Sequence, residues 1–306
     1  NIDDLPENDT LIKVLYSSLN YKDALSASGN RGITRRYPHT PGMDAAGIVV
    51  KGPDFREGEE VLAMGFDLGM NTPGGFGQYV RVPSSWVSRK PEGLTLKECM
   101  IYGTAGYTAG LSLMRLAENG VNPDSGEILV TGATGGVGML AIGMLAKIGY
   151  RVVASTGKRE AQEFLKSIGA SEVISREALH DPGKPLSKGR WAGVVDTVGG
   201  EILVSALKST KYGGIVTCCG MVAGTEFCSS IFPFILRGVA LCGIDAAQSP
   251  MGVRKGIWKK LSREWRPENL DGFHIPCALE ELEGRIESML AGQSMGRVVV
   301  SLWTQS

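Results

Sequence analysis

The sequence predicts an α/β protein of two domains, one of them β-rich and the other built on a doubly wound parallel sheet. Three observations predict this fold class. About the first ninety residues consist of short β-rich segments that Gly, Pro and Asp separate. From about residue 97, continuous apolar strands alternate with helices, which is typical of a parallel sheet covered on both faces. The length of 306 residues is enough for two hydrophobic cores.

The β-rich domain is expected to contain residues 1–96 and 267–306. Its first strands are predicted at 11–18, 47–52, 59–64 and 76–83. After helices near 252–263 and 279–291, a last strand at 296–303 is expected to return to the same sheet. The sequence starts on polar residues without an initiator Met, so we expect one or two N-terminal strands to be missing.

Residues 97–266 are expected to form the parallel-sheet domain. Its first segment, 97–117, has helical character interrupted by Gly103 and Gly106. The helices that follow are predicted at 136–148, 159–168 and 201–208. Six strands of this domain are predicted at 127–131, 151–155, 172–175, 193–198, 214–219 and 239–244.

Composition excludes several classes of protein. The 32 basic residues balance the 32 acidic ones, so the net charge implies no nucleic-acid partner. No apolar run approaches the roughly 18–20 residues of a membrane helix, and no secretory leader is present, so we expect a cytoplasmic protein without a membrane partner. The six cysteines form no C-x-x-C pair and only three histidines are present. We therefore expect reduced thiols and no metal site.

A glycine-rich turn, "VTGATGGVG" at 130–138, follows a predicted strand and opens a predicted helix. Gly132, Gly135 and Gly138 are spaced three apart. Without a Cβ, glycines allow a sharp turn and a close approach of backbone N–H groups to a pyrophosphate at the helix N-terminus. The strand, turn and helix together predict a Rossmann-type dinucleotide site; the alternative is a turn used only for packing.

The next strand ends in "ASTGKR" at 154–159, where an NAD-binding protein normally carries an acidic residue for the ribose hydroxyls. No Asp or Glu occurs there before Glu160. Thr156, Gly157 and Lys158 offer hydroxyl, amide and cationic partners to a 2′-phosphate, and Arg176 could reach the same corner. This pattern predicts NADPH rather than NADH; the alternative is a set of solvated surface cations.

Seven segments in order resemble one protein family: "SSLNYKDAL", "PGMDAAGIVV", "GTAGYTA", "VTGATGGVG", "GASEVISRE", "VVDTVGG" and "PFILRGV". They are similar to the medium-chain dehydrogenase/reductase superfamily, within it to the zinc-free quinone-oxidoreductase-like branch, and there to relatives of NADPH-dependent acryloyl-CoA reductase. The resemblance implies a GroES-like substrate domain, a Rossmann NADP-binding domain and an active site in the cleft between them. Met43 and Asp44 stand where zinc-bearing members carry His and Glu.

The resemblance also implies the site residues. Asn20, Tyr21 and Asp23 of "NYKD" are placed beside the nicotinamide, with Asn20 and Tyr21 as candidate catalytic residues. Tyr21 could hydrogen-bond the substrate carbonyl or supply a proton, or serve only in cofactor packing, and Asp23 is expected to fix the loop. Gly292 stands where relatives often carry Asn, so no cofactor contact is assigned to it. The cofactor contacts are expected at Tyr21, Gly132, Thr134, Gly135, Gly136, Val137, Gly138, Thr156, Gly157, Lys158, Arg176, Met221 and Ala246.

The expected reaction is hydride transfer from NADPH to the β-carbon of an α,β-unsaturated acyl-CoA, without a metal. The alternatives are reduction of quinones and a catalytically idle NADPH-binding scaffold or sensor. Arg31, Arg35 and Arg36 in "NRGITRRYPH" are candidates for the CoA phosphates, although such a loop could simply be solvated. The expected partners are a small-molecule substrate and a second copy of the chain, with which it forms a homodimer.

Overall fold

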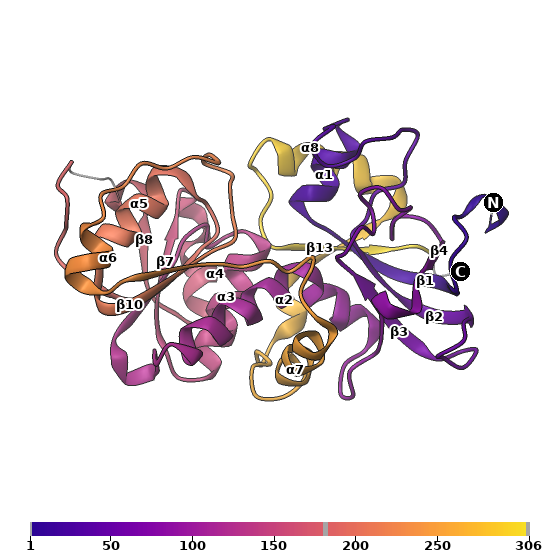
Figure 1. The fold of residues 1–306 in the computed structure, drawn as a ribbon, viewed down its shortest axis with the longest axis horizontal. Helices are drawn as coiled ribbons and strands as arrows, with labels where there is room; N and C mark the ends of the chain where they lie inside the picture. The colour runs from indigo at the N-terminus through magenta and orange to yellow at the C-terminus, as the bar shows by residue number, and fades with distance from the viewer. Residues whose placement is uncertain (1, 180–182, 304–306) are drawn as a thin grey trace. The chain divides into compact units, whose positions relative to one another are not determined.

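The computed structural model describes residues 2–179 and 183–303, which form two compact units (Figure 1). Unit 1 comprises Asn1–Tyr107, Ala246–Arg263 and Asn269–Ser306, and unit 2 comprises Thr108–Asp245 and Glu264–Glu268. The sequence-based boundaries differ from these units in three places. Residues 97–107 and 246–263, which we placed in the parallel-sheet domain, belong to unit 1, and residues 267–268, which we placed in the β-rich domain, belong to unit 2.

Hydrogen bonds explain why these two segments belong to unit 1. The Tyr102 hydroxyl donates to the carbonyl of Leu261 at 3.0 Å. The Arg254 Nη1 atom donates to the carbonyl of Met64 at 3.0 Å, and that residue ends a strand of the unit 1 sheet. The first contact joins the two segments to each other, and the second joins residues 246–263 to the β-rich sheet. No local sequence pattern predicts either contact.

A seven-stranded sheet forms the centre of unit 1. Its order is β12-β13-β1-β2-β3-β5, with β4 paired to β1. All pairs are antiparallel except β12 with β13. The last strand, β13, lies inside the sheet between β12 and β1, which confirms its predicted return to this sheet. The strands are β1 Thr10–Leu19, β2 Asp44–Lys51, β3 Glu60–Met64, β4 Tyr79–Val82, β5 Val87–Arg89, β12 His274–Ala278 and β13 Arg297–Ser301.

Alternating apolar residues of these strands build the core of unit 1. Val14 of β1, Val61 of β3 and Val300 of β13 are fully buried in one hydrophobic cluster. The helices of the unit are α1 Tyr21–Ala27, the first part of α2 Leu96–Glu118, α7 Met251–Leu261 and α8 Leu282–Leu290. The sequence did not predict α1, because its seven residues are too short for a periodic signal.

Unit 2 contains a six-stranded parallel sheet of order β8-β7-β6-β9-β10-β11. In chain order this is 3-2-1-4-5-6, the arrangement of dinucleotide-binding Rossmann domains. The topological switch point of this sheet lies between β6 and β9. At the carboxyl ends of these two neighbouring strands, the chain leaves in opposite directions. The strands are β6 Glu127–Val130, β7 Arg151–Thr156, β8 Ala170–Ser175, β9 Trp191–Asp196, β10 Thr210–Cys218 and β11 Ala240–Gly243.

Three helices of unit 2 were predicted: α3 Gly136–Lys147, α4 Gln162–Ser167 and α5 Gly200–Lys208. The unit also contains the end of α2 and a short helix that the sequence did not predict, α6 Phe232–Arg237. Leu129, Val153, Val194 and Val216 from four strands share one buried cluster. Among the described residues, none of the helices has the length and apolar character needed to span a bilayer.

Gly103 interrupts α2, as the sequence predicted. Its φ of 49° and ψ of −154° are non-helical, and a positive φ of this size favours glycine. A Cβ there would lie 2.5 Å from Ser18 Oγ, 2.6 Å from Asp44 Oδ2 and 2.8 Å from Arg297 Nη2. The predicted interruption at Gly106 was wrong: this residue is helical, and its missing side chain makes room for Tyr102.

Replacing Gly103 by Ala is expected to destabilise unit 1 strongly, because the new methyl group would collide with a buried polar cluster. We expect a loss of about 3 kcal/mol or more in the free energy of unfolding, measured by urea denaturation. Gly120 near the end of α2 is the matched control, since its φ is 83° but nothing lies within 4 Å of the position that a Cβ would take. Gly120→Ala should lose only about 1–2 kcal/mol, and equal losses would contradict the steric explanation.

Candidate functional site

The glycine-rich turn connects β6 to α3 and requires glycine at two of its positions. Gly132 has a φ of 58°, and a Cβ on it would lie 2.3 Å from Thr197 Oγ1. A Cβ on Gly138 would lie 2.4 Å from the Gly132 carbonyl oxygen. Gly135 precedes the first turn of α3, in which Gly136 and Val137 lie. The turn therefore brings the backbone amides of the α3 N-terminus close to the end of β6, as a pyrophosphate site needs.

Asp196 at the end of β9 holds this turn from the other side of the switch point. It is fully buried, and Thr131 Oγ1 donates to its Oδ1 at 2.7 Å while the Gly199 N–H donates to its Oδ2 at 2.9 Å. Thr197 completes the link by donating from Oγ1 to the carbonyl of Thr131 at 2.9 Å. Burial raises the pKa of Asp196, and the hydrogen bond from Thr131 opposes that shift. The sequence reasoning gave this aspartate no role.

The basic corner that we predicted for a 2′-phosphate is assembled in unit 2. The Lys158 N–H donates to Thr156 Oγ1 at 3.0 Å, which closes the turn after β7. The Arg176 guanidinium lies over Gly157, where a Cβ would be 2.7 Å from Nη2. Burial lowers the pKa of Lys158, and the charge of Glu160 opposes that shift. The glycine thus admits an arginine from the end of β8, so two cations flank one turn.

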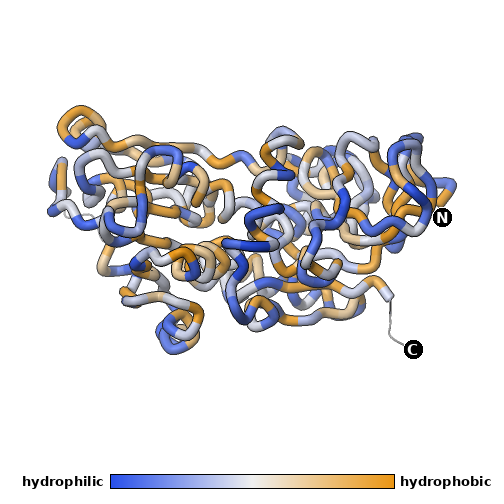
Figure 2. The backbone as a smooth tube through the Cα atoms, turned by 90° about the horizontal axis from the view of Figure 1, so that it is seen from below, coloured by the Kyte–Doolittle hydropathy of each residue, from blue (hydrophilic) through white to orange (hydrophobic). Residues whose placement is uncertain are grey.

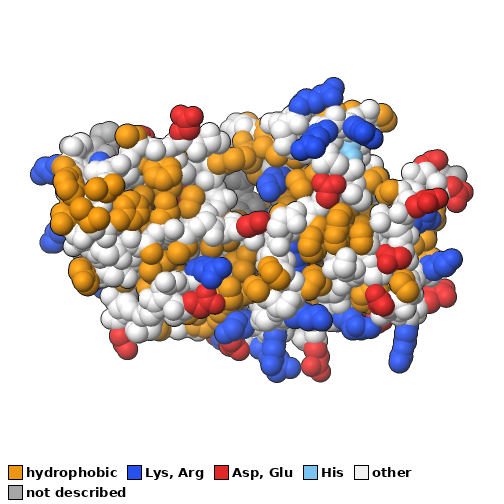
Figure 3. All heavy atoms as spheres, in the orientation of Figure 1, with side chains coloured by type: hydrophobic (Ala, Val, Ile, Leu, Met, Phe, Trp, Pro, Cys, Tyr) orange, Lys and Arg blue, Asp and Glu red, His pale blue; other side chains and the backbone are white. Residues whose placement is uncertain are grey.

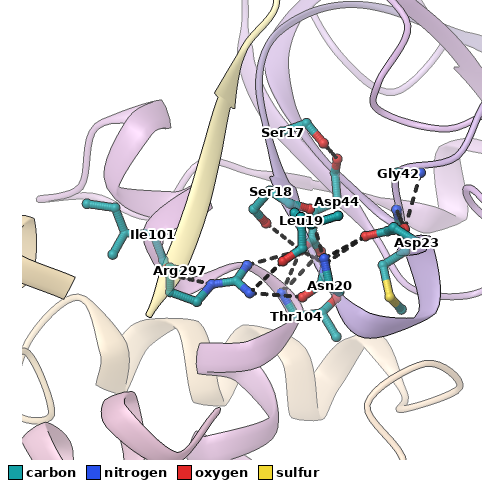
Figure 4. Close-up of polar contacts among 11 residues, drawn as sticks. Ser17, Ser18, Leu19, Asn20, Asp23, Gly42, Asp44, Ile101, Thr104 and Arg297 are labelled. Atoms are coloured by element: carbon teal, nitrogen blue, oxygen red, sulfur yellow. Dashed lines mark hydrogen bonds and ion pairs between the residues drawn. The ribbon is translucent and has the colours of Figure 1, made fainter. Parts of the chain in front are cut away.

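In unit 1, the segment that ends β1 and begins α1 carries a buried polar network (Figure 4). Asn20 immediately precedes α1, and its backbone N–H donates to Asp23 Oδ2 at 2.8 Å. Asp23 Oδ1 accepts the N–H groups of Met43 at 2.8 Å and Gly42 at 3.2 Å. Asp23 therefore ties the start of α1 to the segment before β2, which agrees with the loop-fixing role that we expected for it.

The same network centres on Asp44 and Arg297. Asp44 Oδ2 accepts Ser18 Oγ at 2.6 Å and Asn20 Nδ2 at 2.7 Å, while Thr104 donates its hydroxyl to Oδ1 at 2.6 Å. Arg297 Nη2 lies 3.7 Å from Asp44 Oδ2, and both side chains are at least 97% buried. The break in α2 at Gly103 turns the Thr104 N–H toward the Asp44 carboxylate, which therefore lies at the beginning of the second part of that helix.

Arg297 distributes its donors over three elements. Its Nε donates to the carbonyl of Ile101 at 3.1 Å, and its Nη1 donates to the carbonyl of Leu19 and to Asn20 Oδ1, both at 3.1 Å. Burial lowers the pKa of Arg297, and the charges of Asp44 and Asp23 oppose that shift. As a result the Asn20 amide is engaged through both its nitrogen and its oxygen.

Asp23 is the titratable group of this network. It is 1% exposed, and burial raises its pKa to about 7, with a further contribution from the charge of Asp44. The hydrogen bonds from Asn20 and Met43 oppose the shift, because they favour the charged carboxylate. Burial outweighs them, so Asp23 is placed to change charge near neutral pH.

The residues at the His-Glu position of zinc-bearing relatives do not fit a zinc site. Met43 offers a thioether, and Asp44 is already committed to hydroxyl, amide and guanidinium donors. Within residues 2–179 and 183–303, no three His, Cys, Asp or Glu side chains form a group that could hold a metal.

Tyr21, Ala246 and Met221 take no part in the hydrogen bonds described for the two units above. Tyr21 is the first residue of α1 and half-buried, and its hydroxyl has no hydrogen-bond partner among the described residues. Ala246 belongs to unit 1, and its carbonyl accepts a hydrogen bond from Arg254 at 2.9 Å. Met221 lies in unit 2 in the loop after β10 and is 41% exposed.

The basic loop after α1 is exposed, as Figure 3 shows by the basic side chains gathered near that helix. Arg31 donates from Nη1 to the carbonyl of Arg35 at 3.0 Å and lies over the Tyr37 ring at 5.8 Å. Arg35 and Arg36 are exposed, and their side chains form no hydrogen bond or ion pair with the described part of the chain. Arg35 and Arg36 therefore keep all of their side-chain donors for a ligand, whereas Arg31 uses one of its five in the contact with Arg35.

Arg297, Thr104 and Ser18 are members of the unit 1 network to which the sequence reasoning gave no role. Arg297 stands in "GRVVVSLW", a strand that is otherwise apolar, and a charged residue at the start of a buried strand is the signal that could have found it. Thr104 directly follows Gly103, which we identified only as a helix interruption. A hydrogen-bonding role for Thr104 could have been inferred from that position.

Comparison with protein families matches two models to this chain. Residues 6–92 match the alcohol dehydrogenase GroES-like domain, and residues 136–263 match the zinc-binding dehydrogenase domain. The first match covers the β-rich N-terminal part, and the second begins at the helix after the glycine-rich turn.

Three relatives match almost the whole chain. "Putative quinone oxidoreductase YhfP" of Bacillus subtilis is 49% identical over 98% of this chain and 92% of that protein, and its NAD-bound crystal structure superimposes with a TM-score of 0.95, covering 98% of this chain and 93% of that one. Acrylyl-CoA reductase AcuI of Ruegeria pomeroyi is 39% identical over 99% of this chain and 92% of that protein. The NADPH-bound structure of Escherichia coli YhdH is 40% identical, with a TM-score of 0.96 and coverage of 99% and 94%.

The pH dependence of stability should report the raised pKa of Asp23. The native carboxyl binds its proton more tightly than the unfolded one, so its contribution to stability is present at low pH and is lost as the pH rises through about 7. We expect this group to add a slope approaching 1.4 kcal/mol per pH unit between about pH 4 and pH 7. Asp23→Asn removes the titrating group, and urea denaturation across pH 5–8 should show the variant's profile to be flatter. Parallel profiles would contradict the assignment.

Proposed function

Since the chain belongs to the zinc-free branch of the medium-chain dehydrogenase/reductase superfamily, we propose that it is an NADPH-dependent reductase of α,β-unsaturated acyl-CoA thioesters such as acryloyl-CoA. One observation carries the cofactor choice: Lys158 and Arg176 flank a turn that holds no carboxylate. The name of the Ruegeria relative supports the substrate class. NADPH bound to the Escherichia coli relative supports the cofactor, whereas the Bacillus relative was crystallised with NAD.

The residues of unit 2 that would hold the cofactor fit its chemistry. Gly132, Gly135 and Gly138 give the backbone room, and the N-terminal amides of α3 suit a pyrophosphate. Lys158 and Arg176 suit a 2′-phosphate, since a guanidinium can make paired hydrogen bonds to it. When bound, NADPH supplies the hydride for the β-carbon of the substrate. The remaining proposed contacts are Thr134, Gly136, Val137, Thr156, Gly157, Met221 and Ala246.

We assign different roles to Tyr21 and Asn20. The Tyr21 hydroxyl is available to donate a hydrogen bond to the substrate carbonyl, on which negative charge develops when a hydride adds to the conjugated alkene. The Asn20 amide, in contrast, is committed to Asp44 and Arg297. Asn20 would therefore act as a positioning residue that fixes the start of α1 and, with it, Tyr21.

The exposed guanidinium groups of Arg35 and Arg36 support a thioester with a phosphorylated tail. A CoA substrate carries several phosphate groups, and arginine is well suited to bind them. A simple quinone carries none and would not need these cations. Quinone reduction by the same residues is the alternative function, supported by the name of the Bacillus relative, and an idle NADPH-binding scaffold is the third.

We also propose that the chain forms a homodimer through unit 2. Helix α6 packs against β10 and directly precedes the edge strand β11 in the chain. Its residues Ile235 and Leu236 are 64% and 57% exposed, and Ile231 just before α6 is 65% exposed. Figure 2 colours α6 as largely hydrophobic, and Figure 3 shows hydrophobic side chains gathered over that end of unit 2. An exposed sheet edge next to an apolar patch suits pairing with a second copy. The six unpaired cysteines suit a reducing compartment such as the cytoplasm.

Steady-state turnover distinguishes the three candidate functions. We expect NADPH oxidation that depends on acryloyl-CoA and exceeds the rate with simple quinones. A higher kcat/KM with quinones would favour the alternative function, and NADPH binding without turnover of either substrate would favour the scaffold.

Lys158→Glu should weaken NADPH binding while leaving NADH binding nearly unchanged, because only NADPH carries the 2′-phosphate. A charge-assisted contact of this kind contributes about 1.5–3 kcal/mol, so we expect the Kd for NADPH to rise by at least roughly tenfold in isothermal titration. Lys147→Glu, on the exposed end of α3, controls for the change in net charge. Equal losses for both dinucleotides would refute the proposed phosphate site.

The double variant Arg35→Ala/Arg36→Ala should raise the KM for acryloyl-CoA several-fold. The effect should grow at low salt, where charges are less screened. A small enone without the CoA tail should be reduced as by the wild type. If the KM for both substrates rises alike, the loop does not bind the CoA phosphates.

Ile235→Asp is expected to convert the dimer to a monomer, because a carboxylate in an apolar interface loses its hydration. Sedimentation velocity measures the mass directly. Leu290→Asp at the exposed end of α8 is the control and should stay dimeric. A wild-type protein that sediments as a monomer at micromolar concentration would overturn the dimer.

A further inference from the structure

Arg254 of α7 is buried without any part in the network of Figure 4. It is 2% exposed, and its guanidinium donates to four backbone carbonyls within unit 1. Three of them belong to one short segment: Nε donates to Ser249 at 3.0 Å, and Nη2 donates to Ala246 at 2.9 Å and to Ala247 at 2.8 Å. We call residues 246–249 the Ala246 segment. The fourth carbonyl is that of Met64 at 3.0 Å, so the arginine anchors the Ala246 segment to the end of β3.

Aromatic rings enclose this guanidinium. The Arg254 Cζ atom lies 4.5 Å from the centre of the Phe66 ring and 5.2 Å from that of Tyr107. Phe66 in turn stacks on Trp86, with ring centres 5.3 Å apart and planes 8° apart. Rings on which a guanidinium can rest exclude water while stabilising the charge. The cation is thus held in one place by packing as well as by hydrogen bonds.

The backbone around Arg254 is shaped to accommodate the contact. Phe66 has a φ of 50° without being glycine, and its N–H donates to the Ala247 carbonyl at 2.8 Å. Gly65, with a φ of 71°, could carry no side chain, because a Cβ would lie 2.9 Å from Arg254 Nη2. A positive φ at a non-glycine residue carries a conformational cost that persists only where the surroundings fix it. Strain at this point suggests a functional reason for the exact course of the backbone.

In a planar trans peptide, the C=O of one residue and the N–H of the next point in opposite directions. Because the carbonyls of Ala246 and Ala247 point at Arg254, the N–H groups of the residues that follow them point away from it. The guanidinium therefore sets the orientation of two successive peptide planes. The Tyr107 hydroxyl adds a hydrogen bond to the Ser249 side chain at 2.5 Å, which holds the far end of the segment.

We propose that Arg254 is a positioning residue for the nicotinamide end of the cofactor, acting through the Ala246 segment. The proposal rests on the proposed function, in which Ala246 is a cofactor contact, and on the family resemblance, which implies that this contact is near the nicotinamide. Arg254 does not touch the cofactor itself. Arg254 fixes the backbone of the Ala246 segment before the cofactor binds, so cofactor binding does not have to order that segment.

The test compares two ligands that differ in whether they carry the nicotinamide end of the cofactor. 2′,5′-ADP carries the adenine and the 2′-phosphate but no nicotinamide. Arg254→Met keeps most of the side-chain length and removes the donors. We expect it to raise the Kd for NADPH by about tenfold in isothermal titration while changing the Kd for 2′,5′-ADP less than about twofold. In the cofactor-free variant, amide hydrogen exchange of residues 246–249 should become faster than in the wild type.

Tyr102→Phe is the matched control. It removes the hydrogen bond from Tyr102 to the Leu261 carbonyl at the other end of α7, and so weakens the attachment of the helix without touching the Ala246 segment. It should leave the ratio of the two Kd values unchanged. Equal effects of Arg254→Met on both ligands, or none on either, would overturn the positioning role. A wild-type protein that binds neither ligand would instead refute the proposed cofactor. If Arg254→Met fails to fold, Arg254→Lys, which retains the charge, replaces it. The ratio of the Kd values for NADPH and 2′,5′-ADP is then measured for that variant.

Discussion

The contact between Arg297 and Asp44 is the interaction on which the arrangement of unit 1 depends. Both side chains are removed from water, which is unfavourable for a charged group unless hydrogen bonds replace its hydration. Hydrogen bonds replace most of this hydration. The carboxylate has hydroxyl and amide donors, and Nε and Nη1 of the guanidinium donate to backbone carbonyls. Within the described part of the chain, Arg297 Nη2 has no hydrogen-bond partner and lies 3.7 Å from Asp44 Oδ2. Each of these groups comes from a different part of the unit, namely β1, β2, β13, α2 and the residue before α1. The pair therefore aligns five elements at once, and the position of Tyr21 on α1 is one result.

Unit 2 achieves a comparable alignment with neutral donors. Asp196 joins the end of β6, through Thr131, to the turn at Gly199, and no cation takes part in the contacts that hold it. The two units thus use the same principle, a buried carboxylate with its oxygens satisfied, at the ends of strands where the predicted site residues lie. In unit 1 a second carboxylate, Asp23, lies in the same network and is kept partly protonated by burial. The contrast explains why the titratable behaviour near neutral pH belongs to unit 1.

The sequence could predict those features that are formed by residues close together in the chain. The Gly132 turn, the strand and helix around it and the basic residues after β7 lie within about thirty positions. Spacing alone therefore predicted the strand, turn and helix that the structure shows, and it led us to expect a phosphate site at Lys158. The Arg297–Asp44 contact joins residues more than 250 positions apart, and no periodicity reports it. β12 was missed because Pro276 and its polar flanks conceal an edge strand. The assignment of α7 to the wrong domain has the same cause: Arg254 reaches Met64 across 190 positions.

The place of β13 inside the unit 1 sheet has a consequence for the order in which the chain can fold as it leaves the ribosome. Unit 2 is almost continuous in sequence and can close before β13 is made. Unit 1 has to wait, since the strand that fills the space between β12 and β1 follows all of unit 2 in the chain. At about 5–20 residues per second, Asp44 would leave the tunnel roughly 10–50 s before its arginine. During that interval β1 has an open edge, and the nascent chain is exposed to misassociation on one half while the other is already complete.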